Sequence, residues 1–318
     1  MHIVVTGANG FVGRALMARL RQSALPGCAP ITRLTAMDTG FSPVEPAPFE
    51  HRVQGSIADR AIVAGAFDMP VDIVFHLASI PGGAAEQNYE LSRDINVGGT
   101  TLLLEACKAQ SERGGRKPVF VFASTIGVFG SPLPAIVDDT TPPHPGMTYG
   151  AQKLIGEVLV AEFTRREWAN GRSLRLPGVL ARPPAETGQM SAFISNMIRE
   201  LGAGKPFTCP VGPQATTWGS SLGNVLDNLV HAATVDGRAL GRSRCVTLPT
   251  QYFSFGELAE AIAQVRGAGQ AEVRWEPNAR LEALFGKMPP LHTPTADAAG
   301  FKHDGDLATL VRRATELD

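Results

Sequence analysis

Tyr149 and Lys153 form a Tyr-x-x-x-Lys pair within a segment whose apolar residues recur at helical spacing. Residues four apart lie on one face of a helix, one turn from each other. A nearby ammonium stabilises a phenolate and lowers the pKa of the phenol from its usual value of about 10. Tyr149 could then exchange a proton with a substrate hydroxyl. Such a pair also arises by chance, so its meaning depends on the motifs around it.

A hydroxyl pair follows the apolar segment 118–123, which we expect to be a buried strand. Ser124 and Thr125 come directly after it. A hydroxyl at the carboxyl end of a strand can hydrogen-bond a reacting oxygen and orient it. We predict this role for Thr125, with Ser124 as its neighbour. The alternative is that the residue only caps a turn.

Three glycines lie between the first expected strand, His2–Thr6, and the first expected helix, Phe11–Gln22. Their G-x-x-G-x-x-G spacing permits a tight turn and close approach of a pyrophosphate. The N-terminus of the following helix offers free N–H groups and a partial positive charge to phosphates. We therefore predict a dinucleotide-binding loop that consists of Gly7, Asn9, Gly10, Phe11, Val12 and Gly13.

Asp38 ends the second expected strand, 31–37. A carboxylate there can accept hydrogen bonds from the adenosine ribose and repels a 2′-phosphate, which predicts NAD rather than NADP. The alternative is a solvated turn residue before Gly40. With NAD, Tyr149 would take the proton of a substrate alcohol as hydride leaves, and Lys153 would also hold the nicotinamide ribose.

Short apolar runs alternate with amphipathic segments, which predicts an α/β protein with a parallel sheet covered on both faces. We expect a Rossmann-type, doubly wound sheet in residues 1–177. Residues 178–318 should form a smaller, partly interleaved substrate domain, with a segment near 222–250 returning to the first domain. The further expected strands are 71–76, 173–177 and 244–248, and the further expected helices are 91–110, 149–166, 190–202, 222–235 and 254–265, the last with a Ser254/Glu257 capping box.

Composition excludes several classes of protein. The 318 residues carry a net charge of −1, so no basic surface suggests nucleic acid or an anionic membrane. No apolar run is long enough to span a bilayer, and no signal peptide is recognisable. The four cysteines lack metal or disulfide spacing, so we expect them reduced, with no metal site, in a cytoplasmic enzyme.

Together these motifs resemble the extended short-chain dehydrogenase/reductase family, also called the NAD-dependent epimerase/dehydratase family. The resemblance extends over nearly the whole chain and includes segments 76–79, 94–100 and 175–179. It implies a homodimer that associates through two helices. It further implies cofactor contacts from Ser56, Ile57, Leu77, Ala78, Ser79, Asn96, Pro177 and Val179. Many relatives carry Asp in place of Ser56, which weakens that contact to the adenine.

The substrate class is indicated by a missing cation. Nucleotide-sugar enzymes of the family grip a diphosphate with an Arg in the second half, whereas the corresponding segment 214–220 has none. Segments 147–153, 170–177 and 193–200 resemble the D-erythronate dehydrogenases, which oxidise carbon 2 of a four-carbon sugar acid with NAD. Loop 184–188 departs from that group. The resemblance implies oxidation of D-erythronate to 2-dehydro-D-erythronate.

An aldonate needs a cation for its carboxylate, and a bidentate guanidinium suits it. We predict Arg182 by position; the alternative is a surface arginine paired with Glu186. Further predicted substrate contacts are Ser79, Thr125, Tyr149, Ser191 and Trp218. An L-threonine 3-dehydrogenase, a nucleotide-sugar 4-epimerase and a non-catalytic NAD-binding regulatory protein remain alternative functions.

Overall fold

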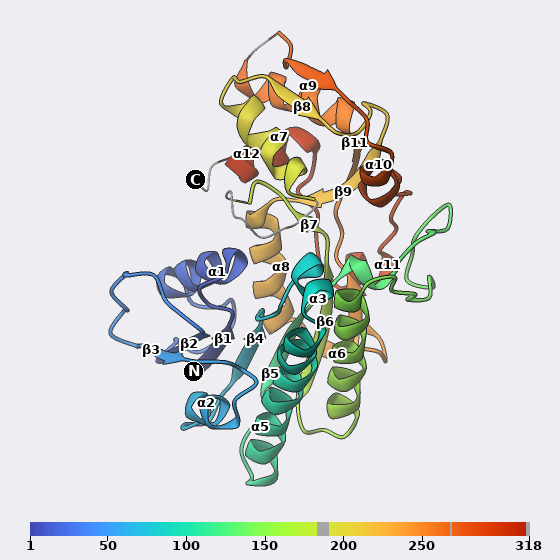
Figure 1. The fold of residues 1–318 in the computed structure, drawn as a ribbon. Coiled ribbons are helices and arrows are strands. Elements are labelled where there is room, and N and C mark those ends of the chain that lie inside the picture. The colour runs from blue at the N-terminus through green and yellow to red at the C-terminus, as the bar shows by residue number, and fades with distance from the viewer. Residues whose placement is uncertain (183–190, 268, 316–318) are drawn as a thin grey trace. The chain divides into compact units, whose positions relative to one another are not determined.

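The computed structural model describes residues 1–182, 191–267 and 269–315 (Figure 1). The chain forms two compact units. The first contains Met1–Ser131, Pro143–Arg175 and Leu229–Thr247. The second contains Pro132–Pro142, Leu176–Asn228 and Leu248–Asp318. From the sequence we expected the boundary between the two domains at residue 177. The corresponding segment of the first unit ends at Arg175.

A seven-stranded parallel sheet forms the centre of the first unit, in the order β10-β6-β5-β4-β1-β2-β3. The order runs outward in both directions from β1 and β4, so the sheet has a switch point between them, where ligands of such folds bind. This confirms the predicted doubly wound α/β class. The strands are β1 (His2–Thr6), β2 (Arg33–Asp38), β3 (Glu50–Gln54), β4 (Ile73–His76), β5 (Val119–Thr125), β6 (Asn170–Leu176) and β10 (Cys245–Thr247).

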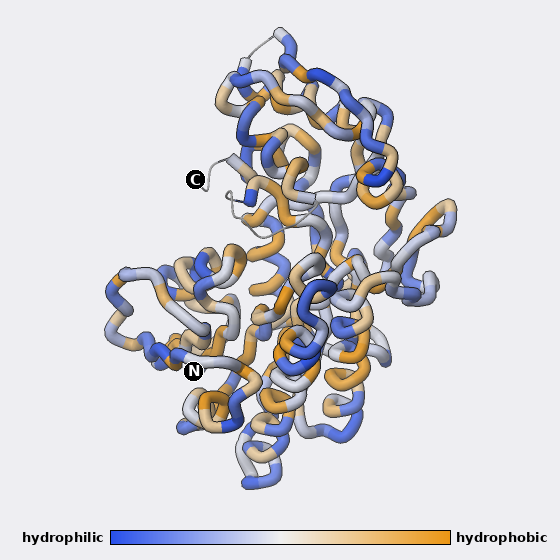
Figure 2. The backbone as a smooth tube through the Cα atoms, viewed as in Figure 1, coloured by the Kyte–Doolittle hydropathy of each residue, from blue (hydrophilic) through white to orange (hydrophobic). Residues whose placement is uncertain are grey.

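A late segment of the chain, β10, belongs to this sheet. It pairs in parallel with β6, with Cys245 opposite Ser173 and Thr247 opposite Arg175. The central strands are buried on both faces, which explains their nearly unbroken apolar sequences. Hydrophobic residues are correspondingly concentrated along these strands and the inner sides of the helices (Figure 2).

Helices cover the sheet of the first unit. The predicted helix 91–110 is interrupted: a π-helical segment, Asp94–Gly99, separates α4 from α5. Such segments frequently mark functional sites. The helices with bounds in this unit are α1 (Phe11–Gln22), α2 (Arg60–Ala66), α3 (Gly82–Gln87), α4 (Tyr89–Arg93), α5 (Thr100–Glu112) and α6 (Thr148–Arg165), and two 3₁₀ turns cover Ile126–Val128 and Gly237–Leu240. α8 (Leu222–Thr234) begins in the second unit and ends in the first.

The second unit has two small sheets and its own apolar core. Its core helices α7, α9 and α12 pack on one another. The predicted capping box at Ser254 and Glu257 is confirmed at the start of α9. The strands are β7 (Gly178–Val179), β9 (Thr216–Ser220) and β11 (Gln251–Ser254) in one sheet, and β8 (Phe207–Cys209) and β12 (Val273–Trp275) in the other. The helices are α7 (Ala192–Gly202), α9 (Phe255–Arg266), α10 (Ala279–Phe285), α11 (Pro294–Ala298) and α12 (Leu307–Thr315).

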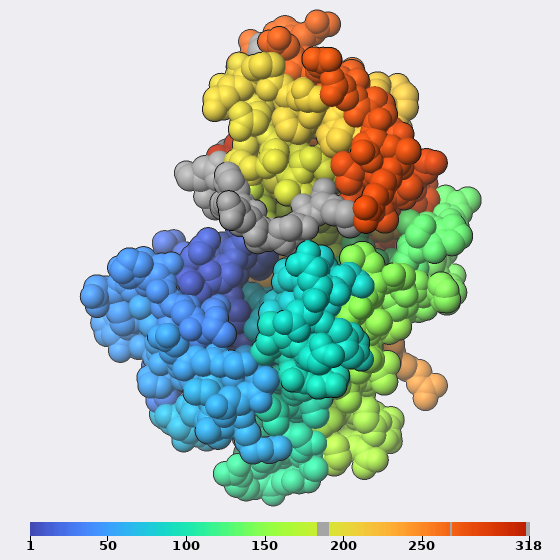
Figure 3. Space-filling model, in the orientation of Figure 1, coloured from blue at the N-terminus to red at the C-terminus, as the bar shows by residue number. Residues whose placement is uncertain are grey.

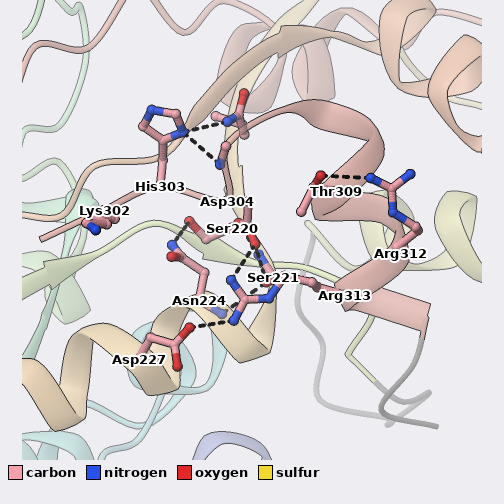
Figure 4. Close-up of polar contacts among 12 residues, drawn as sticks. Ser220, Ser221, Asn224, Asp227, Lys302, His303, Asp304, Thr309, Arg312 and Arg313 are labelled. Carbon is pink, nitrogen blue, oxygen red and sulfur yellow. Dashed lines mark hydrogen bonds and ion pairs between the residues drawn. The ribbon is translucent and has the colours of Figure 1, made fainter.

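A buried carboxylate ties the C-terminal segment to α8 (Figure 4). Asp304 accepts a hydrogen bond from the backbone N–H of Ser221 at 2.9 Å and another from its hydroxyl. Arg313 lies 3.7 Å from the same carboxylate and also pairs with Asp227. A carboxylate at this position satisfies N–H groups at a helix start and compensates the helix dipole.

Within the described parts of the chain, no helix is long and apolar enough to cross a membrane. All four cysteines are free thiols, and Cys107 and Cys209 are buried.

Candidate active site

The predicted nucleotide and catalytic residues of the first unit converge on one edge of its sheet. The glycine loop follows β1, Asp38 ends β2, segment 77–79 follows β4, and Thr125 ends β5. The carboxyl ends of parallel strands share an edge, so these residues lie around the switch point between β1 and β4.

The glycine loop is packed too tightly for side chains. A Cβ atom on Gly13 would lie 1.9 Å from the carbonyl oxygen of Gly7, so α1 can approach the turn only with a glycine there. Gly10 is the N-cap residue of α1 and supplies no side-chain cap. The first N–H groups of α1 are therefore available to a phosphate. This arrangement fits the pyrophosphate of a dinucleotide.

Asp38 is held in a fixed orientation beside this loop. One carboxylate oxygen accepts from the backbone N–H of Asn9 at 2.9 Å and the other from that of Thr39 at 2.8 Å. The side-chain oxygen of Asn9 in turn accepts from the hydroxyl of Ser42 at 3.0 Å. Oδ1 also accepts from the Thr39 hydroxyl at 3.4 Å, whereas Oδ2 keeps a further lone pair for a ribose hydroxyl.

A buried histidine links the nucleotide loop to the π-helical segment. The His76 ring contacts the hydroxyls of Thr6 at 2.7 Å through Nδ1 and of Thr100 at 2.8 Å through Nε2. Thr100 donates its own proton to the Asn96 carbonyl, and Thr6 accepts from the N–H of Ala78. The chain of bonds therefore assigns the proton to Nε2, with Nδ1 accepting from Thr6.

His76 is neutral for electrostatic reasons as well. Burial lowers the pKa of His76 well below its usual range, and the positive charge of Lys153 lowers it further. With both ring nitrogens occupied, His76 is a structural residue.

Asn96 acts on the cofactor turn through the backbone of Ile80. Its amide oxygen accepts from the Ile80 N–H at 2.7 Å, and its amide nitrogen donates to the Ile80 carbonyl at 3.0 Å. The same nitrogen donates to the side-chain oxygen of Gln152, whose amide donates to Ser92. Asn96 therefore connects the turn after β4 with α6, and its predicted contact to the cofactor stays a prediction.

Ser124 and Thr125 point to different surroundings because successive strand residues face opposite sides. Ser124 is buried, and its hydroxyl donates to Glu157 at 2.5 Å. Thr125 is half-buried, and its hydroxyl oxygen accepts from the N–H of Gly127 at 3.1 Å. That oxygen can still donate its proton. Of the two hydroxyls, only that of Thr125 has this capacity at the edge of the sheet.

Tyr149 and Lys153 lie against the end of β5 because Gly150 permits close packing. A Cβ atom on Gly150 would lie 2.4 Å from the carbonyl oxygen of Gly127. The Nζ atom of Lys153 lies 5.7 Å from the centroid of the Tyr149 ring and donates to the Ala123 carbonyl at 2.8 Å. The amine is thus near enough to act on the phenol by its charge.

Burial makes the charge of Lys153 costly. The side chain is 1% exposed, and desolvation lowers its pKa from 10.5 to about 7, while the negative charge of Glu157 opposes this shift. The predicted catalytic pair therefore consists of one half-buried phenol and one deeply buried amine.

Other predicted residues take positions that leave their roles as predictions. Ser56 stabilises a turn, since its hydroxyl accepts from the Ala58 N–H at 3.1 Å, and Ile57 is buried against Gly99. Phe11 and Val12 begin α1, and Ser79 lies in the segment after β4.

The predicted residues from the second half belong to the second unit. Pro177 precedes β7, which contains Val179, and Ser191 precedes α7. The indole of Trp218 is buried in β9 and donates to the Pro289 carbonyl at 2.7 Å, so packing within the unit accounts for it. The Arg182 carbonyl accepts from the Arg199 side chain. Its alternative partner Glu186 and the divergent loop 184–188 lie outside the described residues.

The structure adds residues that the sequence interpretation missed. Gln152 directly precedes Lys153, and Glu157 follows it by four residues. Both could have been found as buried polar residues on α6. Thr6 and Thr100 carried no signal, because their partner His76 is distant in the sequence.

The profile of the NAD dependent epimerase/dehydratase family matches residues 3–231. The chain belongs to this family. D-erythronate dehydrogenase from Cupriavidus necator is 34% identical over 99% of this chain and 98% of its own length. The protein of that name from Haemophilus influenzae is 28% identical over 100% of both chains.

Among solved structures, the nucleoside-diphosphate-sugar epimerase from Agrobacterium tumefaciens superposes with a TM-score of 0.92 at 31% identity, covering 100% of this chain and 94% of that one. As a member of the epimerase/dehydratase family, the chain is a nicotinamide-dependent oxidoreductase. The resemblance stated from the sequence is thereby confirmed.

Lys153→Met should stabilise the cofactor-free protein. The unfolded chain binds the Lys153 proton more tightly than the folded one, so the stability of the wild type rises between about pH 7 and the unfolded pKa of 10.5. The variant should lack this dependence and melt several degrees higher at about pH 6, with the gap closing toward about pH 10. Thermal melting across this range measures it. Lys205→Met, at an exposed lysine, should show no such gain; an equal gain there would contradict the burial argument.

Proposed function

We propose that this protein is a cytoplasmic NAD-dependent dehydrogenase that oxidises D-erythronate to 2-dehydro-D-erythronate. The observation that carries the proposal is that Thr125, Tyr149 and Lys153 gather at the carboxyl end of β5, on the sheet edge that also carries the glycine loop. The two full-length relatives named D-erythronate dehydrogenase support the substrate.

The chain's own residues would carry out the proton transfer. Thr125 donates to the substrate oxygen and orients it, and Tyr149 as phenolate accepts the proton of the substrate hydroxyl. Lys153 stabilises the phenolate by its charge. A bound nicotinamide supplies the acceptor for the hydride.

A small substrate is supported by the composition and packing of β9. Its residues Thr216–Ser220 include no cation that could bind a diphosphate. Thr217 and Trp218 are buried, and the hydroxyl of Thr216 donates to the Met288 carbonyl at 2.7 Å. We propose Arg182 as the partner of the sugar-acid carboxylate, because a guanidinium binds it in a bidentate manner.

Turnover on a substrate panel tests the proposed activity. NADH formation should be rapid with D-erythronate and absent with L-threonine. Tyr149→Phe should lower kcat about 10²- to 10⁴-fold because the general base is lost. Tyr252→Phe, at an exposed tyrosine, should retain wild-type turnover.

Normal turnover by Tyr149→Phe would remove Tyr149 from the mechanism. Interconversion of a UDP-hexose without net NADH formation would favour a 4-epimerase, and turnover of L-threonine would favour the threonine dehydrogenase alternative. Tight NAD binding with silence on every substrate would support a regulatory protein.

The preference for NAD is proposed from Asp38. Its fixed carboxylate would repel a 2′-phosphate, so kcat/KM should favour NAD over NADP by at least ~10-fold, since ~1.4 kcal/mol of repulsion suffices. Asp38→Asn should reduce this ratio by about the same factor, chiefly through KM for NADP. Steady-state kinetics with both cofactors measure the ratio, and an unchanged ratio in the variant would assign the preference elsewhere.

We further propose a homodimer that associates through α4 and α6. These neighbouring helices carry exposed apolar side chains: Val158 is 63% and Ile155 45% exposed on α6, and Tyr89 and Leu91 are exposed on α4. Such apolar patches mark association surfaces. The surfaces of α3, α4 and α6 adjoin one another in Figure 3.

Val158→Lys should shift the protein from dimer to monomer, because burying an unpaired ammonium in an apolar interface is costly. Sedimentation equilibrium measures the change. Val44→Lys places the same charge at a residue 56% exposed outside these helices and should leave the dimer intact. A dimeric Val158→Lys variant would place the interface elsewhere.

A further inference from the structure

Glu157 is a buried carboxylate with a complete set of partners inside the first unit. It is 5% exposed and lies on α6, one turn beyond Lys153. Ser124 donates to one oxygen at 2.5 Å. Arg175 on β6 donates to both oxygens, at 3.0 Å from Nε and 2.8 Å from Nη2. The carboxylate is thus matched by a guanidinium and a hydroxyl donor inside the protein.

Lys153 has few groups to compensate its charge. Its Nζ donates to the Ala123 carbonyl and lies 4.8 Å from the Phe122 ring centroid. His76 is neutral, and burial raises the pKa of the Cys245 thiol far above its usual range, so that group is neutral too. The charge that acts on Lys153 is then that of Glu157, which is itself paired with Arg175, and the phenol of Tyr149 lies beside the amine.

We propose that Glu157 is a positioning residue that keeps Lys153 protonated, and that this charge makes Tyr149 acidic enough to serve as the base. The inference deepens the proposed function and depends on it. Glu157 does not touch the reacting atoms: eight residues along a helix separate it from Tyr149 by ~12 Å, with Lys153 ~6 Å from each.

Charge balance in a region of low dielectric favours this role. Lys153, Arg175 and Glu157 together carry one net positive charge. Removing the Glu157 charge leaves two cations in the same interior, where like charges disfavour ionisation strongly. Lys153 is the group that can respond, because a guanidinium does not lose its proton. A neutral Lys153 would no longer stabilise the phenolate of Tyr149.

If Glu157 had a purely structural role, its removal would affect the stability of the protein and not the pKa of Tyr149. The Ser124–Glu157–Arg175 contacts join β5, α6 and β6, so their loss would lower stability whatever the charge. The ionisation of Tyr149 separates the two roles, because it responds to charge and not to stability.

Ultraviolet titration of tyrosinate in the cofactor-free protein provides this measurement. The chain has three tyrosines, and the other two, Tyr89 and Tyr252, are 54% and 43% exposed. Subtracting the titration of Tyr149→Phe leaves the signal of Tyr149, whose midpoint belongs to the coupled Tyr149–Lys153 pair. In Glu157→Gln this midpoint should rise by at least about one pH unit, toward the usual value of about 10.

A charge-compensated variant separates charge from structure. Glu157→Gln combined with Arg175→Gln again leaves one net positive charge, so the Tyr149 midpoint should return toward the wild-type value even though the ion pair is gone. Glu162→Gln, at an exposed glutamate on the same helix, should leave the midpoint unchanged. Circular dichroism verifies that each variant is folded.

Two results would overturn the inference: an unshifted midpoint in folded Glu157→Gln, or a double variant displaced as far as the single one. Neither depends on turnover. Failure of the proposed function would appear instead as unimpaired D-erythronate oxidation by Tyr149→Phe or as no oxidation by the wild type, so the two failures are distinguishable.

Discussion

The buried amine of Lys153, packed against β5, is the constraint on which the surrounding part of the first unit depends. Lys153 lies where water cannot solvate its charge, so nearby groups must compensate it. The Ala123 carbonyl, the Phe122 ring and the carboxylate of Glu157 provide this compensation. The close packing of α6 on β5 follows from the same requirement, and the protein gives up stability to hold a proton there.

A second, neutral network serves the nucleotide half. His76 joins β1 to the π-helical segment with a single defined tautomer, and Asn96 extends the network to the turn at Ile80 and to α6. The hydrogen bonds around His76 define its proton position, and the ring is neutral. The network can therefore hold the turn at Ile80 in one position without placing another charge next to Lys153. The two networks meet on α6 at Gln152 and Lys153.

Local patterns in the sequence were sufficient to predict the glycine loop, Asp38, the Tyr149/Lys153 pair and the central strands, whose apolar runs are long and unbroken. The polar strand β3 and the π-helical segment were missed, because neither has a distinct periodicity. Thr125 was predicted rather than Ser124, but the bond of Ser124 to Glu157 on α6 could be known only from the fold. The Glu157 and His76 networks join residues far apart in the chain, so only the fold reveals them.

The late return of the chain to the central sheet has a consequence for synthesis on the ribosome. β6 has its outer partner only when β10, residues Cys245–Thr247, has been made. Until then the nascent chain presents the backbone of β6 as an open strand edge, which can pair with other chains. A fragment ended near residue 177 would keep that edge permanently. The first unit is therefore not separable by simple truncation after residue 177, because β6 would lack one of its two neighbours.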